Sequence, residues 1–346
     1  MSINLYSTHE LMGVVRTLRP PVTFWLDLCF KRVKTFGTEY IDFDDVIRGR
    51  RMAPFVAPNV SGRVMQEQGY TTKKFKPAYI KPKHVLDPTR TLTRMAGEAI
   101  GGDMSPGERF DANVADLLQT QREMVTRRLE WMASQAVQFG EVTVSGDDYP
   151  SQTVDFGRTI TDKNLTGNDR WSISHADSDP FADLDAWMTE LFQTAGYPAT
   201  VAVMGTSAYA AMAAKTQFSN YLDIRRVTST TFDIGPGNGL PAQYKGTLTN
   251  GLEIWVYNDI YENDSGTNVA MMDPRDVILV NPAGLEGVRC FGAIMDARNG
   301  YQPVEMFPKM WEQEDPSVVY LMTQSAPLMV PMRPNASLRA RVINDA

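Results

Sequence analysis

One long amphipathic segment, roughly residues 107–139, constrains the fold of this chain more than any other part of the sequence. Ser105 is predicted to cap a helix here, with Glu108 three residues after the cap, and Gly140 is a natural stop. Apolar residues recur at helical spacing, and the charged residues, Glu130 among them, fall largely between them. At about 1.5 Å per residue, the helix would be roughly 50 Å long. Such a rod is long for a globular domain and predicts a spine that other elements lie across.

Shorter elements on both sides of this segment predict an α+β fold. We expect strands at 141–146, 152–157, 200–205, 252–258 and 276–282, and helices at 179–195 and from Ser207 to about Asn220. Residues 161–180 are expected to form a polar loop. Residues 1–45 indicate an extended or partly helical arm with an apolar anchor at 24–30. Residues 46–95 hold five prolines, which fits a long β-hairpin or extended loop better than a helix.

The net charge of −7 conceals a strong asymmetry. Residues 48–94 hold eleven basic and two acidic residues, a net of +9, whereas residues 98–148 hold four basic and ten acidic residues, a net of −6. A basic segment can bind nucleic acid, but this one is interrupted by prolines and glycines and has no recognition helix or zinc ligands. The other partner for its charge is an acidic surface of the same protein, in the same copy or in a neighbouring one.

Residues that carry enzyme chemistry are scarce in this sequence. His9, His84 and His175 are the three histidines, and none has a carboxylate or a second histidine at metal-ligand spacing. There is no GxSxG or Walker A motif, and the glycine-dense loop at 235–239 has no following Lys-Ser/Thr. Cys29 and Cys290 are expected to be two buried thiols. We therefore predict no catalytic residue, no metal and no cofactor, and a protein that is not an enzyme.

The first residues, MSINLYSTHELMGVV, lack the basic and then apolar pattern of a secretory signal. Uncharged apolar stretches fall far short of the ~20 residues that a membrane-spanning helix needs. We expect a cytosolic product with no membrane anchor.

Several segments resemble one known family and follow one another in the same order. They are PNVSGRVMQEQG (58–69), PAYIKPKHVLDP (77–88) with Thr91–Arg94 after it, TVAVMGTSAYAAM (200–212), YLDIRR (221–226), YKGTLTNGLEIWVY (244–257), VILVNPAGLEGVRCFGAIMDA (277–297) and YLMTQSAPLMV (320–330). YIKPKHxxxP and QSAPLM are the most specific pieces. Together the segments cover nearly the whole chain and resemble the lambda-type major capsid proteins of tailed double-stranded DNA phages, which have the Hong Kong 97-like fold.

The resemblance implies a division into an N-terminal arm (1–45), an extended loop (46–95), a peripheral domain with the spine helix (96–174), an axial domain (175–285) and a return to the peripheral domain (286–346). It implies a major capsid protein that assembles as pentamers and hexamers into an icosahedral shell around packaged double-stranded DNA. The protein would lie in the virion, and in the host cytoplasm during assembly. Because a motor drives DNA into such shells, the shell wall need not neutralise the negative charge of the DNA. An acidic chain fits this.

The expected partners are other copies of the chain, a portal and a separately encoded scaffold, because the shell motifs begin by about residue 50. The use of a decoration protein stays open. In this family the extended loop lies across a neighbouring subunit, so the basic loop and the acidic spine of adjacent copies are predicted to be electrostatic partners. The candidate contact residues are Lys73, Lys74, Lys76, Lys81, Lys83, Glu108, Asp111, Asp116, Arg225 and Arg226.

Three other functions remain as alternatives. The first is an encapsulin-like compartment, which shares the fold class and encloses cargo enzymes. The second is a hydrolase or transferase with an unusual site, which the shortage of histidines and nucleophile motifs disfavours. The third is a nucleic-acid binder that uses residues 48–94, whose binding would depend strongly on salt.

Overall fold

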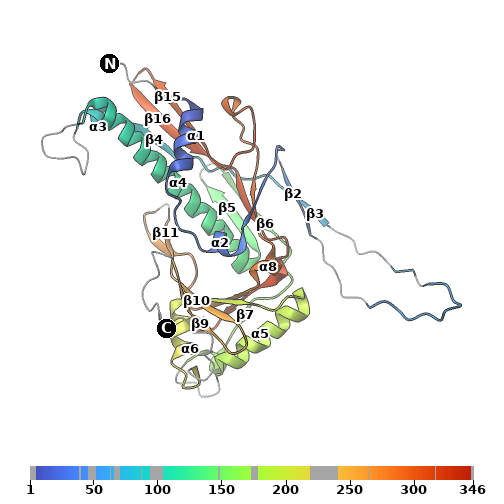
Figure 1. Ribbon diagram of the computed structural model, residues 1–346. Helices are drawn as coiled ribbons and strands as arrows, with labels where there is room; N and C mark the ends of the chain where they lie inside the picture. Colours follow the sequence, from blue (N-terminus) through green and yellow to red (C-terminus); the bar gives the residue numbers. More distant parts are fainter. Residues whose placement is uncertain are drawn as a thin grey trace.

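The computed structural model of this chain describes residues 5–38, 40–45, 52–62, 64–65, 71–86, 88–93, 104–146, 149–172, 178–218, 241–263, 265–315 and 317–343. These residues form helices and small sheets in the mixed α+β arrangement that the sequence predicts. One long helix, α4, crosses the molecule, and packed regions lie along it and at its C-terminal end (Figure 1).

The predicted spine is present as α4, Pro106–Phe139, a helix of 34 residues. Its capping box is reciprocal: the Ser105 amide donates to the Glu108 carboxylate at 2.7 Å, and the Glu108 amide donates to the Ser105 hydroxyl at 3.3 Å. Gly140 ends the helix with a φ of 69°, and a Cβ at this position would lie 2.6 Å from the Cβ of Arg158. Local signals therefore place both ends of the helix where the sequence predicts them.

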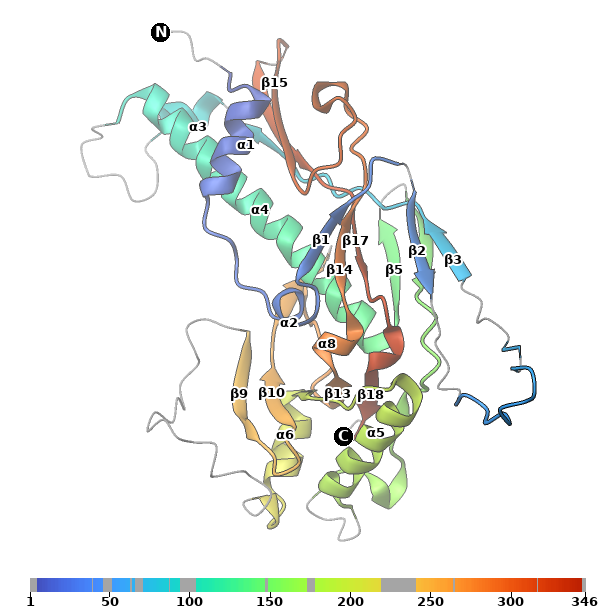
Figure 2. The same cartoon turned by 45° about the vertical axis from the view of Figure 1, so that its right-hand side comes forward.

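The central region packs the C-terminal half of α4 against a three-stranded sheet (Figure 2). The strand order is β1–β14–β17, with bounds Arg32–Thr35, Val288–Phe291 and Pro327–Val330. Strand β1 runs parallel to β14, and β17 runs antiparallel to it. A hairpin of β5 (Glu141–Gly146) and β6 (Tyr149–Asp155) continues from α4, and α8 (Pro282–Leu285) precedes β14. Cys29 and Cys290 are both buried free thiols, as predicted.

A second region surrounds the N-terminal half of α4. It contains the three-stranded sheet β15–β16–β4, with bounds Phe307–Gln313, Val318–Gln324 and Lys83–Leu86, and the helices α1 (Thr8–Thr17) and α3 (Pro88–Leu92). Side chains from α4 and from four of these elements form one small core, including Leu11, Leu86, Leu118, Met310 and Leu321. The first helix of the arm is thus packed on the spine.

The third region is a six-stranded sheet at the C-terminal end of α4. Its order is β7–β18–β13–β8–β10–β9, with bounds Lys163–Asn164, Ser337–Arg341, Asp276–Val280, Val201–Met204, Glu253–Tyr257 and Ala242–Thr247. Helices α5 (Pro180–Ala195) and α6 (Thr206–Ala213) pack against this sheet. The central strands β13 and β8 are buried along their whole length, which explains their continuous apolar runs. A small hairpin of β11 (Ile260–Glu262) and β12 (Asn268–Ala270) lies beside α4.

Strand β18, from the last segment of the chain, lies inside the six-stranded sheet between β13 and β7. The structure differs from the sequence predictions in three places. Helix α6 ends at Ala213 instead of about residue 220. The expected polar loop at 161–180 contains β7 and a 3-10 turn at Gly167–Asp169. Glu130, placed by sequence among the charged residues that lie between the apolar ones, is buried. The pairing of β7 with β18 and the burial of Glu130 under the arm depend on partners far away in the chain, which sequence periodicity does not contain.

Candidate assembly surfaces

A long hairpin leaves the body of the molecule on one side (Figures 1 and 2). Strands β2 (Ile41–Asp45) and β3 (Thr71–Phe75) pair antiparallel and form its base. Ile41 and Phe75 face each other in this register and are both buried in the central core, so the base is fixed to the body. The strand pairing at the base of the hairpin begins at residue 41, and Ile80 bridges to Ser325 in the body, whereas the extended loop is predicted at 46–95.

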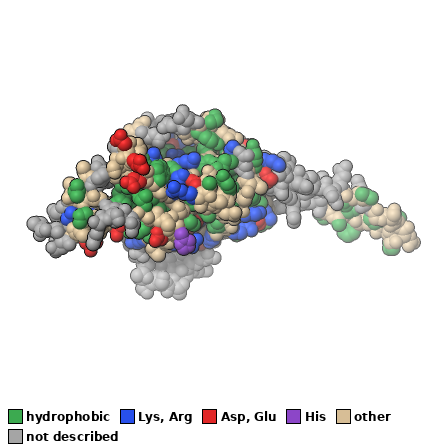
Figure 3. Space-filling view, turned by 90° about the horizontal axis from the view of Figure 1, so that it is seen from above, with side chains coloured by type: hydrophobic (Ala, Val, Ile, Leu, Met, Phe, Trp, Pro, Cys, Tyr) green, Lys and Arg blue, Asp and Glu red, His purple; other side chains and the backbone are tan. Residues whose placement is uncertain are grey.

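The described residues of the hairpin beyond its base are apolar or uncharged and exposed. Residues 52–62 and 64–65 contain no charged side chain. Phe55 is 103% exposed, Val64 93% and Met52 86%. Figure 3 shows hydrophobic side chains on this projecting segment, well away from the main body. Apolar side chains that have no core of their own favour docking on another surface.

The two most specific sequence motifs meet where the hairpin returns to the body. The Ile80 amide donates to the Ser325 carbonyl at 2.8 Å, and the Ser325 amide donates to the Ile80 carbonyl at 3.0 Å. The Tyr79 hydroxyl donates to the Ala293 carbonyl at 2.8 Å. YIKPKH and QSAPLM thus secure the root of the hairpin, although about 240 residues separate them along the chain.

Lysines predicted to take part in contacts between copies have neighbours within their own copy. Lys74 lies across the hairpin from Asp42, with 3.9 Å between its Nζ and the carboxylate. Because both side chains are largely exposed, this ion pair contributes little to stability. The Lys81 ammonium lies 4.8 Å from the ring centre of Tyr79, and the Lys83 ammonium lies 3.8 Å from that of Tyr320.

Lys83 belongs to a cationic and aromatic face on the outside of the sheet β15–β16–β4. Trp311 stacks on Tyr320 with 5.4 Å between ring centres, and the ammonium groups of Lys83 and Lys309 each lie 5.4 Å from the ring centre of Trp311. Val85 is exposed beside Tyr320 in the strand register. Lys309 also pairs with the Asp296 carboxylate at 2.6 Å, so part of the positive charge on this face is balanced within the same copy.

The three predicted acidic residues lie on α4 and differ in their surroundings. Glu108 caps its own helix, and the hydrogen bond from the Ser105 amide lowers the pKa of its carboxyl group. Asp111 accepts a hydrogen bond from the Tyr6 hydroxyl, which together with burial raises the pKa of Tyr6 to about 12. Asp116 is exposed. Of the three, Asp116 can be changed with the least effect on the fold of its own copy.

Three of the remaining predicted contact residues are described only in part or not at all. Lys76 follows β3 and is exposed. Lys73 lies in β3 opposite Phe43, and only its backbone is described. Arg225 and Arg226 lie outside the described residues, as do His175 and the glycine-dense loop at 235–239.

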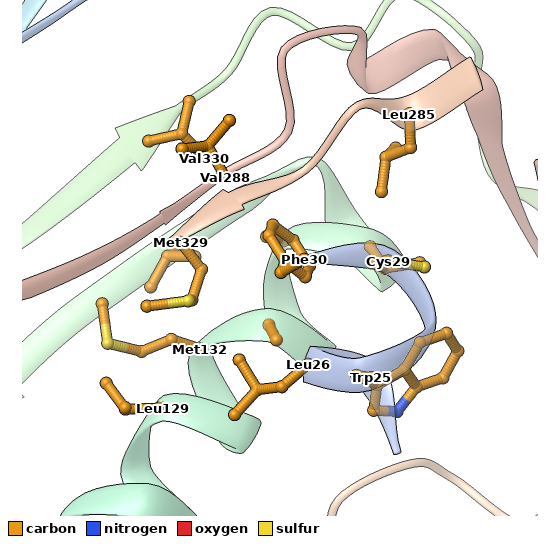
Figure 4. Packing of buried hydrophobic residues seen from close by; sticks show 14 of the residues in the cluster. Trp25, Leu26, Cys29, Phe30, Leu129, Met132, Leu285, Val288, Met329 and Val330 are labelled. Carbon is orange, nitrogen blue, oxygen red and sulfur yellow. The ribbon is translucent and has the colours of Figure 1, made fainter. Parts of the chain in front are cut away.

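A buried carboxylate that sequence reasoning missed fixes the N-terminal arm to the spine. Glu130 of α4 is 2% exposed and accepts hydrogen bonds from the backbone amides of Phe24 (3.0 Å), Trp25 (2.7 Å) and Leu26 (3.1 Å). These amides stand at the start of α2, Trp25–Cys29, which packs among core residues of α4, α8, β14 and β17 (Figure 4). Burial raises the pKa of Glu130, and the amide hydrogen bonds oppose that shift. The apolar run at 24–30 was the available signal for this anchor, but its acceptor could not be read from sequence.

A groove lies between α4 and β11. Its volume is about 450 Å³, and it is lined by Thr120, Glu123, Met124, Arg127, Arg128, Trp131, Tyr261, Glu262 and Asn263. Trp131 and Tyr261 are partly buried against the central core, so they form a firm floor, whereas Met124 is 52% exposed. Arg128 lies over the ring of Trp131 at 5.4 Å. The lining combines an apolar floor with two acidic and two basic side chains.

Within the described ranges, no three His, Cys, Asp or Glu side chains gather in a way that could hold a metal ion. The same part of the chain contains no helix that is both long and apolar enough to cross a membrane.

These features define the class of protein: a shell-building subunit with a spine helix, a projecting hairpin and an anchored arm. The chain resembles the crystal structure of a prophage capsid protein from Escherichia coli CFT073 with a TM-score of 0.76 and 25% identity, over 98% of this chain and 100% of that one. It also shares its fold with a phage-related protein from Bordetella bronchiseptica RB50, with a TM-score of 0.52 and 14% identity, over 99% and 98% of the two chains. The fold is the Hong Kong 97-like capsid fold, as the sequence predicts.

Comparison of sequences gives the family. The model of the family described as phage major capsid protein E matches residues 7–342. The chain is 29% identical to the P21 prophage-derived major head protein of Escherichia coli O6:H1 and 27% identical to the major capsid protein of Escherichia phage lambda. Each alignment covers 95% of this chain and 96% of the relative. The chain therefore belongs to the phage major capsid protein E family, a family of structural virion proteins and not of enzymes. These matches favour the capsid interpretation over the encapsulin-like alternative.

Proposed function

We propose that this major capsid protein assembles as pentamers and hexamers into a closed icosahedral shell around packaged double-stranded DNA. The observation that carries the proposal is the exposed hairpin tip of a chain with this fold. Burying a Phe, Val or Met side chain contributes about 1.5–3 kcal/mol, so several exposed ones favour association. A protruding element that docks on a different surface of the next copy makes a head-to-tail contact, and such contacts can close into rings.

The proposed partners beyond the chain itself are a portal and a separate scaffold. A decoration protein is an additional candidate. The net charge of −7 supports a shell that a motor fills, because a wall that condensed DNA by charge would need many phosphate contacts. Assembly would take place in the host cytoplasm before the protein becomes part of the virion.

We also propose that the basic hairpin and the acidic spine of adjacent copies are electrostatic partners. The described lysines of the hairpin base, Lys74 and Lys76, are exposed, and Asp116 is exposed on α4. Single exposed pairs contribute at most about 1 kcal/mol. Repeated over many subunits, they would steer assembly and set the register between neighbouring copies.

Microscopy of negatively stained particles tests the proposal directly. Co-expression with the scaffold and portal of the same phage should give uniform shells, whereas the chain alone should not. Phe55→Asp should abolish the shells without changing the circular dichroism of the subunit, and Phe55→Leu, which keeps an apolar side chain, should retain them. A wild-type chain that stays monomeric with its scaffold, or natural particles that contain cargo enzyme and no DNA, would contradict the proposal. Uniform shells from the chain alone would contradict the separate scaffold.

A further inference from the structure

We propose that Gln121 of α4 positions the return strand of the hairpin through His84, and that this contact holds only while the His84 imidazole is neutral. His84 lies in β4, within the motif YIKPKH, and is partly buried against α4. The contact would make the root of the hairpin sensitive to pH. It belongs to the folded subunit and does not depend on the proposed shell.

Gln121 is a buried polar residue at the centre of this contact. It is 0% exposed and lies on the face of α4 that packs against the sheet β15–β16–β4. Its amide nitrogen donates to the Leu321 carbonyl at 2.9 Å and lies 2.9 Å from Nδ1 of His84. Its amide oxygen accepts a hydrogen bond from the Thr323 hydroxyl at 2.6 Å. One side chain of α4 therefore joins both β16 and β4 to the spine.

The hydrogen bonds of Gln121 assign the proton of His84. A primary amide carries two hydrogens, and here one is directed to the Leu321 carbonyl and the other to Nδ1. Nδ1 must therefore accept, which places the imidazole proton on Nε2. A second proton, on Nδ1, would set an N–H group against the amide N–H. Turning the amide over would place its oxygen against the Leu321 carbonyl oxygen, so neither orientation accommodates an imidazolium.

The charged groups around His84 are directed elsewhere. β4 packs against β16 and α4 (Figure 1). The ammonium of Lys83 lies over the ring of Tyr320 on the opposite face of the sheet. On α4, Arg122 donates to a carbonyl of the arm at 2.8 Å, and Glu123 accepts from another α4 side chain at 2.6 Å. None of these described groups is a carboxylate directed at His84, so an imidazolium would gain no ion pair from them.

The contact lies where the hairpin rejoins the body. Ile80 and Ser325 exchange two backbone hydrogen bonds just before it, and Leu86 is buried in the small core just after it. Between Ile80 and Leu86, His84 is the described side chain that hydrogen-bonds to α4. Loss of this bond should loosen residues 79–85 and let the hairpin root move, while Leu86 keeps the end of β4 in place.

Proton uptake gives the size and the sign of the effect. A free imidazole takes up a proton near pH ~6.5, so at pH ~5.5 an opened root would be favoured roughly tenfold relative to neutral pH. Because the closed root excludes this proton, its stability is present above that range and is lost as the pH falls. The arm should respond in the opposite direction, because burial raises the pKa of Glu130.

Hydrogen exchange measured by mass spectrometry on peptides covering residues 77–88 tests the contact, at about pH 7.5 and about pH 5.5. After correction for intrinsic exchange, wild-type protection should fall roughly tenfold in acid, while peptides covering β13 keep theirs. His84→Asn keeps an oxygen acceptor for the Gln121 amide and cannot take up a proton, so its protection should be equal at both pH values. The matched control is His9→Asn, which changes an exposed histidine of α1 and should behave like the wild type.

Gln121→Met is the second variant, because it keeps the length of the side chain and removes the amide. Its hairpin root should exchange faster than the wild type at neutral pH and should lose most of the dependence on pH. Equal wild-type protection at both pH values would overturn the proposal, as would an undiminished acid loss in His84→Asn or in Gln121→Met. Failure of the wild-type chain to form shells would count against the proposed function and leave these exchange results unchanged.

Discussion

The buried carboxylate of Glu130 allows a sharp prediction about the N-terminal arm. It accepts three backbone hydrogen bonds from the start of α2 and so joins the arm to the C-terminal half of the spine. Glu130→Ala would leave three buried amides without their acceptor. We expect the arm to detach locally in this variant while the six-stranded sheet remains folded, because that sheet has a separate hydrophobic core.

The magnitude follows from the number and kind of these bonds. A hydrogen bond to a charged group contributes about 1.5–3 kcal/mol, and desolvation of the carboxylate offsets part of the sum. Removing one partner from a buried charged arrangement costs about 3–5 kcal/mol. Opening of the arm should therefore become roughly a hundred-fold easier or more. Glu130→Gln keeps the shape and one acceptor oxygen, so its expected cost is about 1–2 kcal/mol.

Hydrogen exchange measured by mass spectrometry on peptides covering residues 20–31 gives the opening free energy of the arm. The matched control is Glu123→Ala, an exposed glutamate two turns earlier on α4. The control should exchange like the wild type, Glu130→Gln should be intermediate, and Glu130→Ala should be the fastest. If Glu130→Ala exchanged within about threefold of the control, Glu130 would not anchor the arm and the reasoning would be refuted.

Three further predictions concern pH, assembly and backbone space. Because burial raises the pKa of Glu130, the folded chain keeps this proton to higher pH than the unfolded chain does. The free energy of unfolding should therefore fall as the pH rises from the ordinary pKa of a glutamate, about 4.3, through the raised pKa of Glu130. Glu130→Gln should remove this pH dependence, which urea unfolding at several pH values measures. Changing Lys73, Lys74 and Lys76 of the hairpin to Glu should slow assembly at low salt, which light scattering measures. Adding Asp116→Lys should partly restore the rate of assembly. Equal rates at all salt concentrations would contradict the electrostatic pairing. Gly205→Ala should lower the free energy of unfolding, measured in urea, by about 1–3 kcal/mol, because the added Cβ would lie 2.3 Å from the carbonyl oxygen of Pro274. Gly146→Ala, where no atom lies within 4 Å of the added Cβ, should cost clearly less, and equal costs would contradict the steric argument.

The features that sequence predicted well depend on neighbours a few residues apart. The cap at Ser105 and the stop at Gly140 gave the bounds of α4 to within one residue, because hydrogen bonds over three or four residues decide where a helix begins and ends. The cap at Asp179 placed the start of α5 in the same way. The order of motifs gave the family, which matches residues 7–342.

Features that depend on distant partners were decided only by the tertiary structure. Glu130 follows closely after Arg127 and Arg128 in sequence, and its burial results from the arm folding over that side of α4. Strand β18 lies in the six-stranded sheet, where its register with β13 brings Arg339 and Arg341 to the buried carboxylate of Asp276, a partner 63 and 65 residues away in the chain. Ile80 meets Ser325 through backbone bonds, which any residues can form. Sequence by itself therefore determined the bounds of α4, the start of α5 and the family of this protein. Strand partners and buried charges were set by contacts across the fold, because the free energy of burial depends on what covers a residue and not on the residue alone.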